Sequence, residues 1–390
     1  MLLAIGDFGR QMLFPHSNIN LLFLFADEAA AALSAEAVQQ FTQRLGETGL
    51  ETRISSKLLA ELFPFDPEQA EATLSLLDCR FLAGTPQLFA SLHGQLIPEV
   101  IGQEAQSLVE RLAEITRSRH RKFANTVFHL VPNVKEGPGG YLDYIMARWL
   151  AIMSAMVKQH AWPGPDHCFT PEVQPAMDSA LAFFAAVRCF LHFREKRDAN
   201  LLDWGSQDEA AVQAIGAPGD VFHDAIGWMR IYFEHTRAVE HISSQLLEEM
   251  PAAQSLFYRQ LETWRTGFSD NDFSVVDGLI FFKKADGLSD PGLFFRTFLL
   301  IAKRGFKLSP TAEHQLEQCR PKLAAHMPDG DAIWSFFEEM LPEPHAADAL
   351  RAMHSLHLLT MFLPEFQGID ALAVREISHR FTVDEHTLQA

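Results

Sequence analysis

The chain has 390 residues, of which 48% are hydrophobic and 21% are charged, and its formal net charge at pH 7 is −18. This length allows two or three domains with sizeable cores. The acidic balance argues against sequence-independent binding of nucleic acid and against an anionic membrane surface, because both require a basic footprint.

The cysteines are scattered, with no C-x-x-C pair and no histidines at zinc-ligand spacing. We therefore expect neither disulfides nor structural zinc, and we expect small core residues at Cys79, Cys168, Cys189 and Cys319. Met1 leads directly into an apolar run without the basic region of a signal peptide, and we expect no apolar run of transmembrane length. These features predict a cytoplasmic protein.

Residues 4–25 predict a strand, a glycine-bearing turn, a short helix and a second apolar strand. Gly6 and Gly9 stand where a backbone turns tightly and approaches a phosphate closely, and Arg10 supplies a positive planar fork. The N–H groups at the start of the following helix favour an anion. This order of elements is typical of a nucleotide site.

Ser17 opens the second strand, which begins with Asn18, Ile19 and Asn20. Side chains alternate along a strand, so Asn18 and Asn20 are expected on one face, with Ile19 directed into the core.

Beyond this start, most of the chain is predicted to be helical. Alanine-rich residues 29–45 predict a helix over one face of the small sheet, and Glu47 lies in the turn that follows. Apolar spacing and terminal signals predict further helices at residues 68–82, 104–121, 141–158, 180–197, 222–250, 291–304, 310–326, 331–340 and 346–358. Residues 127–130 resemble a strand, and residues 273–282 predict a hairpin that turns at Asp277 and Gly278.

Two of these helices carry polar residues with alternative interpretations. Asp78 and Arg80, at the end of the helix predicted at residues 68–82, are expected to be surface or interdomain pairing groups rather than catalysts. His192 has no carboxylate or cysteine at ligand spacing, so a hydrogen-bonded helix histidine is favoured over a metal ligand.

The segment from Val131 to Asp143 has the sequence V-P-N-V-K-E-G-P-G-G-Y-L-D, in which prolines and glycines force an irregular loop. Gly139 and Gly140 expose backbone N–H groups, and Lys135 has the reach to contact a triphosphate. Alternatively, the loop only fits two domains together. Both interpretations remain open from the residues alone.

These segments resemble the polymerase β-type nucleotidyltransferases, and among them the bifunctional protein-PII uridylyltransferase/uridylyl-removing enzymes. The N-terminal family motif is roughly G-G-(Y/F)-G-R-x-x-L-x-P-x-S-D-x-D-L-L, and this chain replaces its second glycine with Asp7 and its two aspartates with Asn18 and Asn20. The loop motif E-P-N-(I/L)-K-E-G-P-G-G-L-R-D is changed at Val131, Tyr141 and Leu142.

The resemblance implies a predominantly helical α+β fold. Its expected parts are a nucleotidyltransferase domain at residues 1–100, a helical domain at residues 101–368, and the start of a truncated HD phosphohydrolase domain at residues 369–390. His386 matches the first HD histidine, and a single histidine does not hold a catalytic metal. We therefore expect no removal of uridylyl groups.

The resemblance also implies transfer of UMP from UTP to a PII-type nitrogen regulator, with Mg²⁺ held at Asn18, Asn20 and, as a candidate third ligand, Glu47. The nucleotide would contact Gly6, Gly9, Arg10, Ser17, Lys135, Gly139 and Gly140. Mg²⁺ prefers anionic oxygen ligands, so two neutral amides predict an impaired, degenerate site. Asp7 returns a carboxylate nearby, but without a metal it repels a triphosphate. The alternatives are a catalytically silent regulator that binds a nucleotide or PII, and a structural fragment whose active module lies elsewhere.

Overall fold

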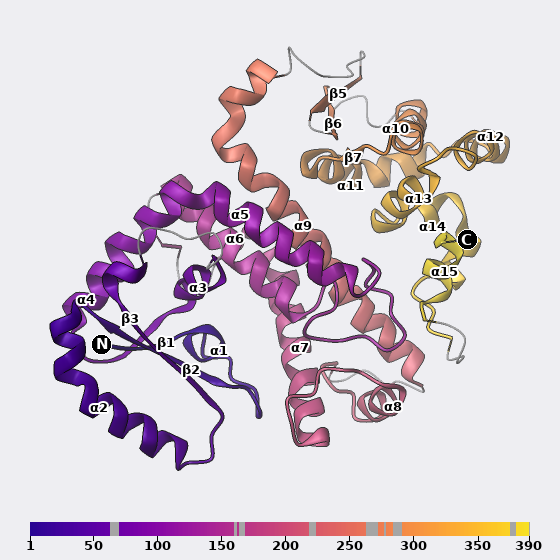
Figure 1. The fold of residues 1–390 in the computed structure, drawn as a ribbon. Coiled ribbons are helices and arrows are strands. Elements are labelled where there is room, and N and C mark those ends of the chain that lie inside the picture. The colour runs from indigo at the N-terminus through magenta and orange to yellow at the C-terminus, as the bar shows by residue number, and fades with distance from the viewer. Residues whose placement is uncertain are drawn as a thin grey trace. The chain divides into compact units, whose positions relative to one another are not determined.

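The structure is a computed structural model that describes residues 1–62, 70–159, 162–163, 168–217, 224–262, 272–276, 278–283, 291–374 and 380–389. It divides into two compact units, the first formed by Met1–Val127 and Val131–Met250, and the second by Phe128–Leu130 and Pro251–Ala390. Each unit is described by itself. The predicted predominantly helical α+β class is confirmed (Figure 1), whereas the module boundaries predicted at residues 100 and 368 remain predictions.

The first unit begins with a four-stranded sheet in the order β3-β2-β1-β4. Its strands are β1 (Leu2–Ala4), β2 (Ile19–Phe25), β3 (Thr52–Leu58) and β4 (Arg80–Ala83). β2 pairs antiparallel with β1 and parallel with β3. The connection between the two parallel strands is α2 (Glu28–Gly46), whose N-cap Asp27 accepts a hydrogen bond from the Ala30 N–H. The predicted strand–turn–strand start and the helix after it are confirmed.

The two faces of this sheet are covered differently. Leu3, Leu22 and Leu24 share one hydrophobic core with the helices that follow, whereas on the other face Phe23 packs edge-to-face against Phe41 of α2. Figure 1 shows α2 along one side of the sheet and α5 and α6 beyond the other. The helices of this unit are α1 (Gly6–Gly9), α3 (Ala70–Ser75), α4 (Pro86–Ser91), α5 (Ile97–Arg121), α6 (Tyr141–Gln159), α7 (Gln174–Glu195), α8 (Trp204–Val212) and α9 (Ala225–Glu262), with short irregular turns η1 (Leu59–Leu62), η3 (Leu76–Asp78) and η4 (Leu92–Leu96).

The prediction of a helix at residues 68–82 is wrong for the second half of this range. Residues 63–69 lie outside the described part of the chain, α3 ends at Ser75, and β4 begins at Arg80. β4 adds to the free edge of β1, with Phe81 opposite Leu3. Pairing with that edge outweighs the local helical pattern, and Gly84, at φ +108°, follows a strand rather than a helix.

The second unit is helical with a small sheet in the order β5-β6-β7. The hairpin of β5 (Phe273–Val276) and β6 (Leu279–Phe282) is confirmed, although its turn residue Asp277 lies outside the described residues. The other elements are β7 (Lys307–Leu308), α10 (Pro291–Arg304), α11 (Pro310–Ala325), α12 (Gly330–Met340), α13 (Ala346–Ser355), α14 (Leu359–Phe362), η6 (Pro364–Gly368) and α15 (Val383–Gln389). The strand expected at residues 127–130 is instead an isolated bridge between His129 and Phe381.

Two other expectations are settled in this description. The four cysteines are free, and burial raises the pKa of the Cys79 thiol to about 12. Contrary to the expectation about apolar runs, α7 is long and apolar enough to cross a membrane by length and composition. It also buries Arg188 and His192.

Asp78 joins the sheet to the helical layer of the first unit. Its fully buried side chain accepts hydrogen bonds from Arg10 and Arg148, and from the Trp149 indole N–H at 2.7 Å. Arg10 follows α1, whereas Arg148 and Trp149 belong to α6, so one carboxylate connects two layers. The expectation of a surface residue is wrong for Asp78, and the interdomain pairing remains a prediction because all these residues belong to one unit.

Replacing Asp78 with Ala is expected to destabilise the protein by about 3–5 kcal/mol, because it leaves buried cationic partners without their anion. Urea denaturation followed by the far-UV signal measures this as a lower midpoint. The control is Glu114→Ala, which removes the exposed Arg111–Glu114 pair and is expected to cost less than about 1 kcal/mol. Equal effects of the two variants would contradict the role assigned to Asp78.

Asp143, near the start of α6, is a second buried carboxylate, and it is bonded to Arg119, to His120 Nε2 at 2.8 Å and to the Gly139 N–H at 2.6 Å. Burial alone raises the pKa of its carboxyl, but the hydrogen bond from His120 and the charge of Arg119 outweigh burial, so the pKa is lowered. A lowered pKa contributes stability that is present above the unfolded-state pKa of about 3.9 and is lost as pH falls through the folded-state value.

Asp143→Asn is therefore expected to lower the urea midpoint at pH 7, and its difference from the wild type is expected to shrink as the pH falls below about 4. Urea titrations at pH 7, 5, 4 and 3 measure this difference. Glu110→Gln, an exposed change on the same helix as Arg119, is the control and should match the wild type throughout. If the difference in urea midpoint did not depend on pH, the charge of Asp143 would not be the source of its stabilising effect.

Candidate functional site

The predicted site lies where the glycine turn meets the start of β2. Gly6 has φ +59°, and a Cβ on it would lie 3.2 Å from the side-chain amide of Asn20. The Ile5 N–H donates to the Asn20 carbonyl at 3.1 Å. The structure thus places Asn20 directly against the turn, whereas Asn18 precedes the first residue of the strand. Both asparagines are half-buried.

The glycine turn is shorter than expected and its second glycine serves packing. α1 consists of Gly6–Gly9 alone, and Arg10 is its C-cap. A Cβ on Gly9 would lie 2.0 Å from the Asp78 carbonyl oxygen, so the close approach at Gly9 is to η3. The Ser17 hydroxyl accepts a hydrogen bond from the Phe14 N–H at 3.3 Å and closes the loop before β2.

Arg10 is surrounded by acids. Its guanidinium bonds to both Asp7 and Asp78, and its side chain is 7% exposed. Burial lowers the pKa of Arg10, but the neighbouring carboxylates of Asp78 and Asp7 outweigh burial and raise it. The positive fork predicted for a phosphate therefore holds two internal carboxylates in this structure.

Asp7 also accepts a hydrogen bond from the Tyr141 hydroxyl at 3.0 Å. Burial and the charge of Asp7 raise the pKa of Tyr141, so the hydroxyl keeps its proton and donates. Asp7 and Tyr141 lie 134 positions apart and both depart from the motifs described above. Two unusual residues thus form one contact between the sheet and α6. We call Asp7, Arg10, Asp78 and Tyr141 the turn cluster.

The proline- and glycine-rich loop packs onto its surroundings with its glycines inside. A Cβ on Gly139 would lie 2.0 Å from the Thr236 carbonyl oxygen of α9, and one on Gly140 would lie 2.7 Å from the Val134 carbonyl oxygen. The Gly139 N–H donates to Asp143, and the Gly140 N–H donates to the Gly137 carbonyl. The loop amides therefore bond within the protein. This arrangement matches the interpretation that the loop fits two parts together.

Lys135 and Glu47 lie apart from the asparagines in their contacts. Lys135 Nζ pairs with Asp198 at 3.2 Å. Glu47 is the exposed C-cap of α2, and it accepts a hydrogen bond from Gln43 at 3.3 Å. The turn after α2 does reach the end of the sheet at which β2 begins, because the Ile19 N–H donates to the Glu51 carbonyl. Opposite Asn20 on β3 stands Arg53, a cation.

Sequence reasoning missed the part played by α7. Arg188 is fully buried, and its guanidinium lies 3.8 Å from the ring centroid of Phe14 and 4.7 Å from that of Tyr141. On the same helix, His192 Nε2 lies 3.0 Å from Asp198, and its Nδ1 accepts from the His16 N–H at 3.2 Å. His192 is thus hydrogen-bonded, as predicted. The sequence did hold one signal, because Asp7 and Tyr141 both differ from the family motifs. These two residues link the glycine turn to α6, which in turn contacts Arg188 of α7.

These residues do not fit a Mg²⁺ site. Asn18 and Asn20 provide neutral amides, the nearby Asp7 carboxylate is bound to Arg10 and Tyr141, and Glu47 is turned to its own helix. Mg²⁺ takes anionic oxygens in close octahedral geometry. We therefore derive no reaction step through a metal.

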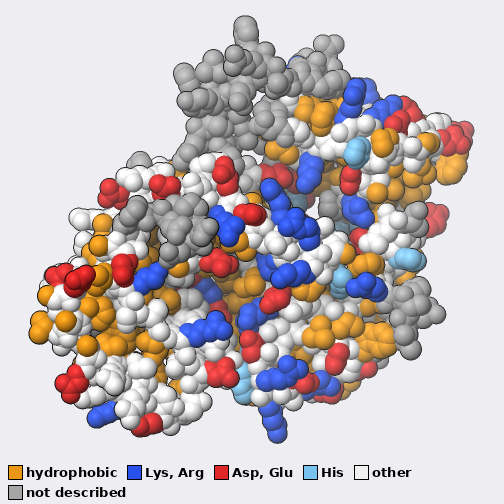
Figure 2. Space-filling model, in the orientation of Figure 1, with side chains coloured by type: hydrophobic (Ala, Val, Ile, Leu, Met, Phe, Trp, Pro, Cys, Tyr) orange, Lys and Arg blue, Asp and Glu red, His pale blue; other side chains and the backbone are white. Residues whose placement is uncertain are grey.

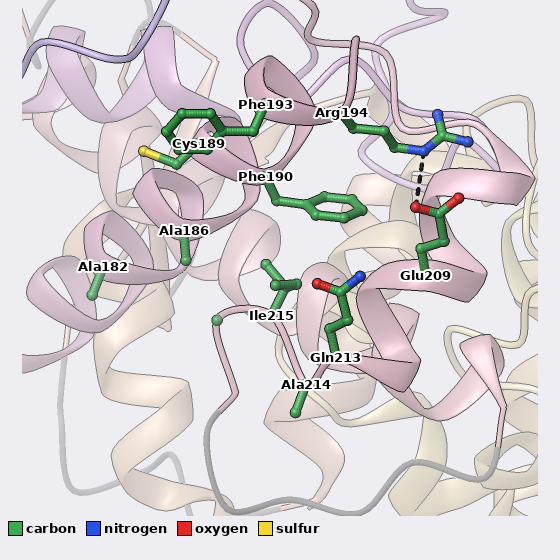
Figure 3. Close-up of a pocket in the computed structure, with 11 residues that line it drawn as sticks. Ala182, Ala186, Cys189, Phe190, Phe193, Arg194, Glu209, Gln213, Ala214 and Ile215 are labelled. Carbon is green, nitrogen blue, oxygen red and sulfur yellow. Dashed lines mark ion pairs between the residues drawn. The ribbon is translucent and has the colours of Figure 1, made fainter. Parts of the chain in front are cut away.

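A pocket of about 830 Å³ lies on another face of α7, against α8 (Figure 3). Its walls are mostly apolar, and Arg194 pairs with Glu209 across it at 3.2 Å. The lining includes none of the predicted site residues; it is formed by Ala182, Ala186, Cys189, Phe190, Phe193, Arg194, Glu209, Gln213, Ala214, Ile215 and Gly216. It is not the predicted nucleotide site.

The surface agrees with the charge balance of the sequence. Figure 2 shows Lys and Arg side chains interspersed with Asp and Glu side chains on the face drawn.

Comparison with known proteins places this geometry in a family context. Residues 107–247 match the family model described as GlnD PII-uridylyltransferase. Bifunctional uridylyltransferase/uridylyl-removing enzymes match over 99% of the chain, at 26% identity in Cereibacter sphaeroides and 28% in Ruegeria pomeroyi. The enzyme of that name from Haemophilus influenzae is 26% identical over the full chain.

The chain spans less than half the length of these relatives, between 42% and 45%. The matches confirm the resemblance recognised from the motifs: residues 107–247 match the GlnD PII-uridylyltransferase model, and the chain is similar along its length to the bifunctional uridylyltransferase/uridylyl-removing enzymes.

Proposed function

We propose that this chain is a uridylyltransferase-like nucleotidyltransferase whose transfer of UMP from UTP to a PII-type protein is impaired. Its proposed partners are UTP and a PII-type signalling protein, and its proposed location is the cytoplasm. The similarity to the bifunctional uridylyltransferase/uridylyl-removing enzymes supports uridylyl transfer as the class of reaction. The observation that supports impairment is the turn cluster, in which Asp7 forms an ion pair with Arg10, the residue expected to bind a phosphate.

The physical reason lies in charge. In-line phosphoryl transfer needs positive groups on the transferred phosphate and on its leaving oxygens. Here two anionic metal ligands are replaced by Asn18 and Asn20, and a carboxylate stands in the phosphate turn. Both changes oppose the binding of a metal–triphosphate complex, the first by removing attraction for the cation and the second by repelling the anion.

The alternative is a catalytically silent homologue that binds a nucleotide or PII as a regulator. The contact between Asp7 and Tyr141 favours it, because this hydrogen bond replaces free donors of the site with an internal contact. Measuring UMP transfer from UTP to a PII-type protein by the unmutated chain separates the two functions. Transfer that is weak but dependent on UTP supports impairment, whereas binding of the PII-type protein without transfer supports the silent regulator.

The asparagine pair is tested by Asn18→Asp combined with Asn20→Asp, which adds two carboxylates with little change in size. Mg²⁺-dependent UTP binding is expected to strengthen at least about tenfold, since a charge-assisted contact contributes about 1.5–3 kcal/mol. Calorimetric titration with UTP, with and without Mg²⁺, measures this change. Each single replacement should do less, because the two ligands act together.

The matched control is Gln39→Glu with Gln87→Glu, which makes the same change in net charge on exposed positions of α2 and α4. It should leave UTP binding as in the wild type. If the asparagine double variant and the wild type show the same metal dependence, the defect lies elsewhere in the site. Strong Mg²⁺-supported transfer by the unmutated chain would show that the site is not degenerate.

The turn carboxylate is tested separately by Asp7→Asn, which keeps the size of the side chain and removes its charge. Loss of this repulsion is expected to strengthen metal-free UTP binding by about tenfold or more, because Arg10 then keeps Asp78 as its anionic partner but no carboxylate of the turn opposes the phosphates. The titration is done in EDTA. Glu36→Gln, an exposed change on α2, is the control. Unchanged UTP affinity in Asp7→Asn would mean that Asp7 does not block a phosphate position.

A further inference from the structure

The second unit contains a separate group of polar residues. His354 is near the end of α13, Asp370 follows η6, and Asp384 is in the first turn of α15. His354 Nε2 lies 2.8 Å from Asp370 Oδ1 and 3.4 Å from Asp384 Oδ2. One ligand atom from each residue lies within 4.8 Å of the other two. Three elements thus bring a nitrogen and two oxygens to one point.

Burial makes this convergence costly without a cation. The side chain of Asp384 is fully buried, that of His354 is 6% exposed and that of Asp370 is 25% exposed. The imidazole ring lies between Phe128 and Phe366, with ring centroids 5.7 and 5.5 Å away. One Nε2–H faces two carboxylate oxygens, and a single proton bonds well to only one of them, whereas a metal ion bonds to both.

We propose that His354, Asp370 and Asp384 bind one divalent first-row transition-metal ion. Ligand atoms bonded at about 2.1 Å to a tetrahedral ion lie about 3.4 Å apart. The distance from Nε2 to Asp384 Oδ2 equals this value, and the distance to Asp370 Oδ1 needs to open by about 0.6 Å. Asp370 is the most exposed of the three, and the adjustment is assigned to its side chain.

The surroundings hold the other two ligands in place. The Ala371 N–H donates to Asp384 Oδ2 at 2.9 Å, which fixes the carboxylate beside the imidazole. Ala371 directly follows Asp370, so one turn carries a ligand and also orients another. Hydrogen bonds of this kind to ligating carboxylates are a regular part of protein metal sites.

The ligand set favours particular metals. Imidazole with carboxylates suits Zn²⁺, Mn²⁺ and Fe²⁺, whereas Mg²⁺ and Ca²⁺ prefer oxygen alone. Three protein ligands leave a coordination position for water, and Asp370 marks the side from which solvent reaches it. This site is distinct from the family-like His386, which is exposed and outside the group. It therefore stands whether or not the proposed uridylyltransferase function is correct.

The test is metal binding by the whole purified chain. After treatment with EDTA and gel filtration, the protein is titrated with Zn²⁺ and, separately, with Mn²⁺, and bound metal is measured by mass spectrometry after a second gel filtration. The wild type is expected to retain about one equivalent that Mg²⁺ does not displace. Asp370→Asn and His354→Gln are each expected to weaken binding at least about tenfold, since loss of even an outer partner of a ligand costs this much.

Two controls separate this site from other histidines. Asp348→Asn removes the exposed His345–Asp348 pair of the same unit, whose atoms lie 3.3 Å apart, and His386→Ala removes the family-like ligand. Both are expected to retain the wild-type equivalent. Asp370→Asn changes a partly exposed residue, and a thermal melt without metal checks that it folds; the metal-induced rise in Tm should be present in the wild type and absent in this variant.

Three results would overturn the proposal. The first is a wild type that retains no stoichiometric metal. The second is undiminished binding in both Asp370→Asn and His354→Gln. The third is binding that is lost in His386→Ala or Asp348→Asn but kept in the variants of the site. In each case the cluster would be a network of side-chain contacts between His354 and the two carboxylates, without a metal.

Discussion

The buried carboxylate of Asp78 is the contact on which the first unit depends. It accepts hydrogen bonds from Arg10 after the glycine turn and from Arg148 and Trp149 of α6, so the small sheet is fixed to the helical layer through one residue. Such a group is stable only while all its partners remain, because each would otherwise be a buried, unpaired polar group. Arg10 is consequently held in one orientation. This constraint brings Asp7, three residues earlier, under Tyr141 and determines the chemistry of the whole turn.

Within that constraint, the departures from the family motifs depend on one another. A glycine in place of Asp7 would leave the Tyr141 hydroxyl without this acceptor, and a leucine in place of Tyr141 would leave Asp7 with one donor fewer. The two residues are far apart in sequence but share one hydrogen bond, so neither change is neutral alone. The same turn carries Asn20 against Gly6. Asp7, Tyr141 and Asn20 therefore all contact the same turn, so these departures from the family motifs lie together in space.

The sequence predicts the elements of this fold well where local signals decide them. The long amphipathic helices and the hairpin at Gly278 were found because periodicity and turn residues act over a few positions. β4 was missed because it exists only through pairing with the edge of β1. The site residues divide in the same way. Gly6 and Asn20 lie together, although the strand pattern predicts only that Asn18 and Asn20 share a face. The sequence also predicts phosphate contacts at Gly9 and Gly139. Gly9 and Gly139 instead pack against the Asp78 and Thr236 backbones, which no local pattern reveals.

Arg188 gives Tyr141 a second neighbour besides Asp7. Its guanidinium is fully buried over the rings of Phe14 and Tyr141, and its Nη1 and Nη2 have no hydrogen-bond partner among the described residues. Its buried charge is balanced by the two ring faces and by Asp198, 3.7 Å away. Tyr141 thus serves two neighbours, with its hydroxyl on Asp7 and its ring on Arg188. Leucine provides neither contact, so restoring the family residue at 141 would weaken the support of a buried cation as well as freeing Asp7. A single change at Tyr141 therefore alters the surroundings of both Asp7 and Arg188.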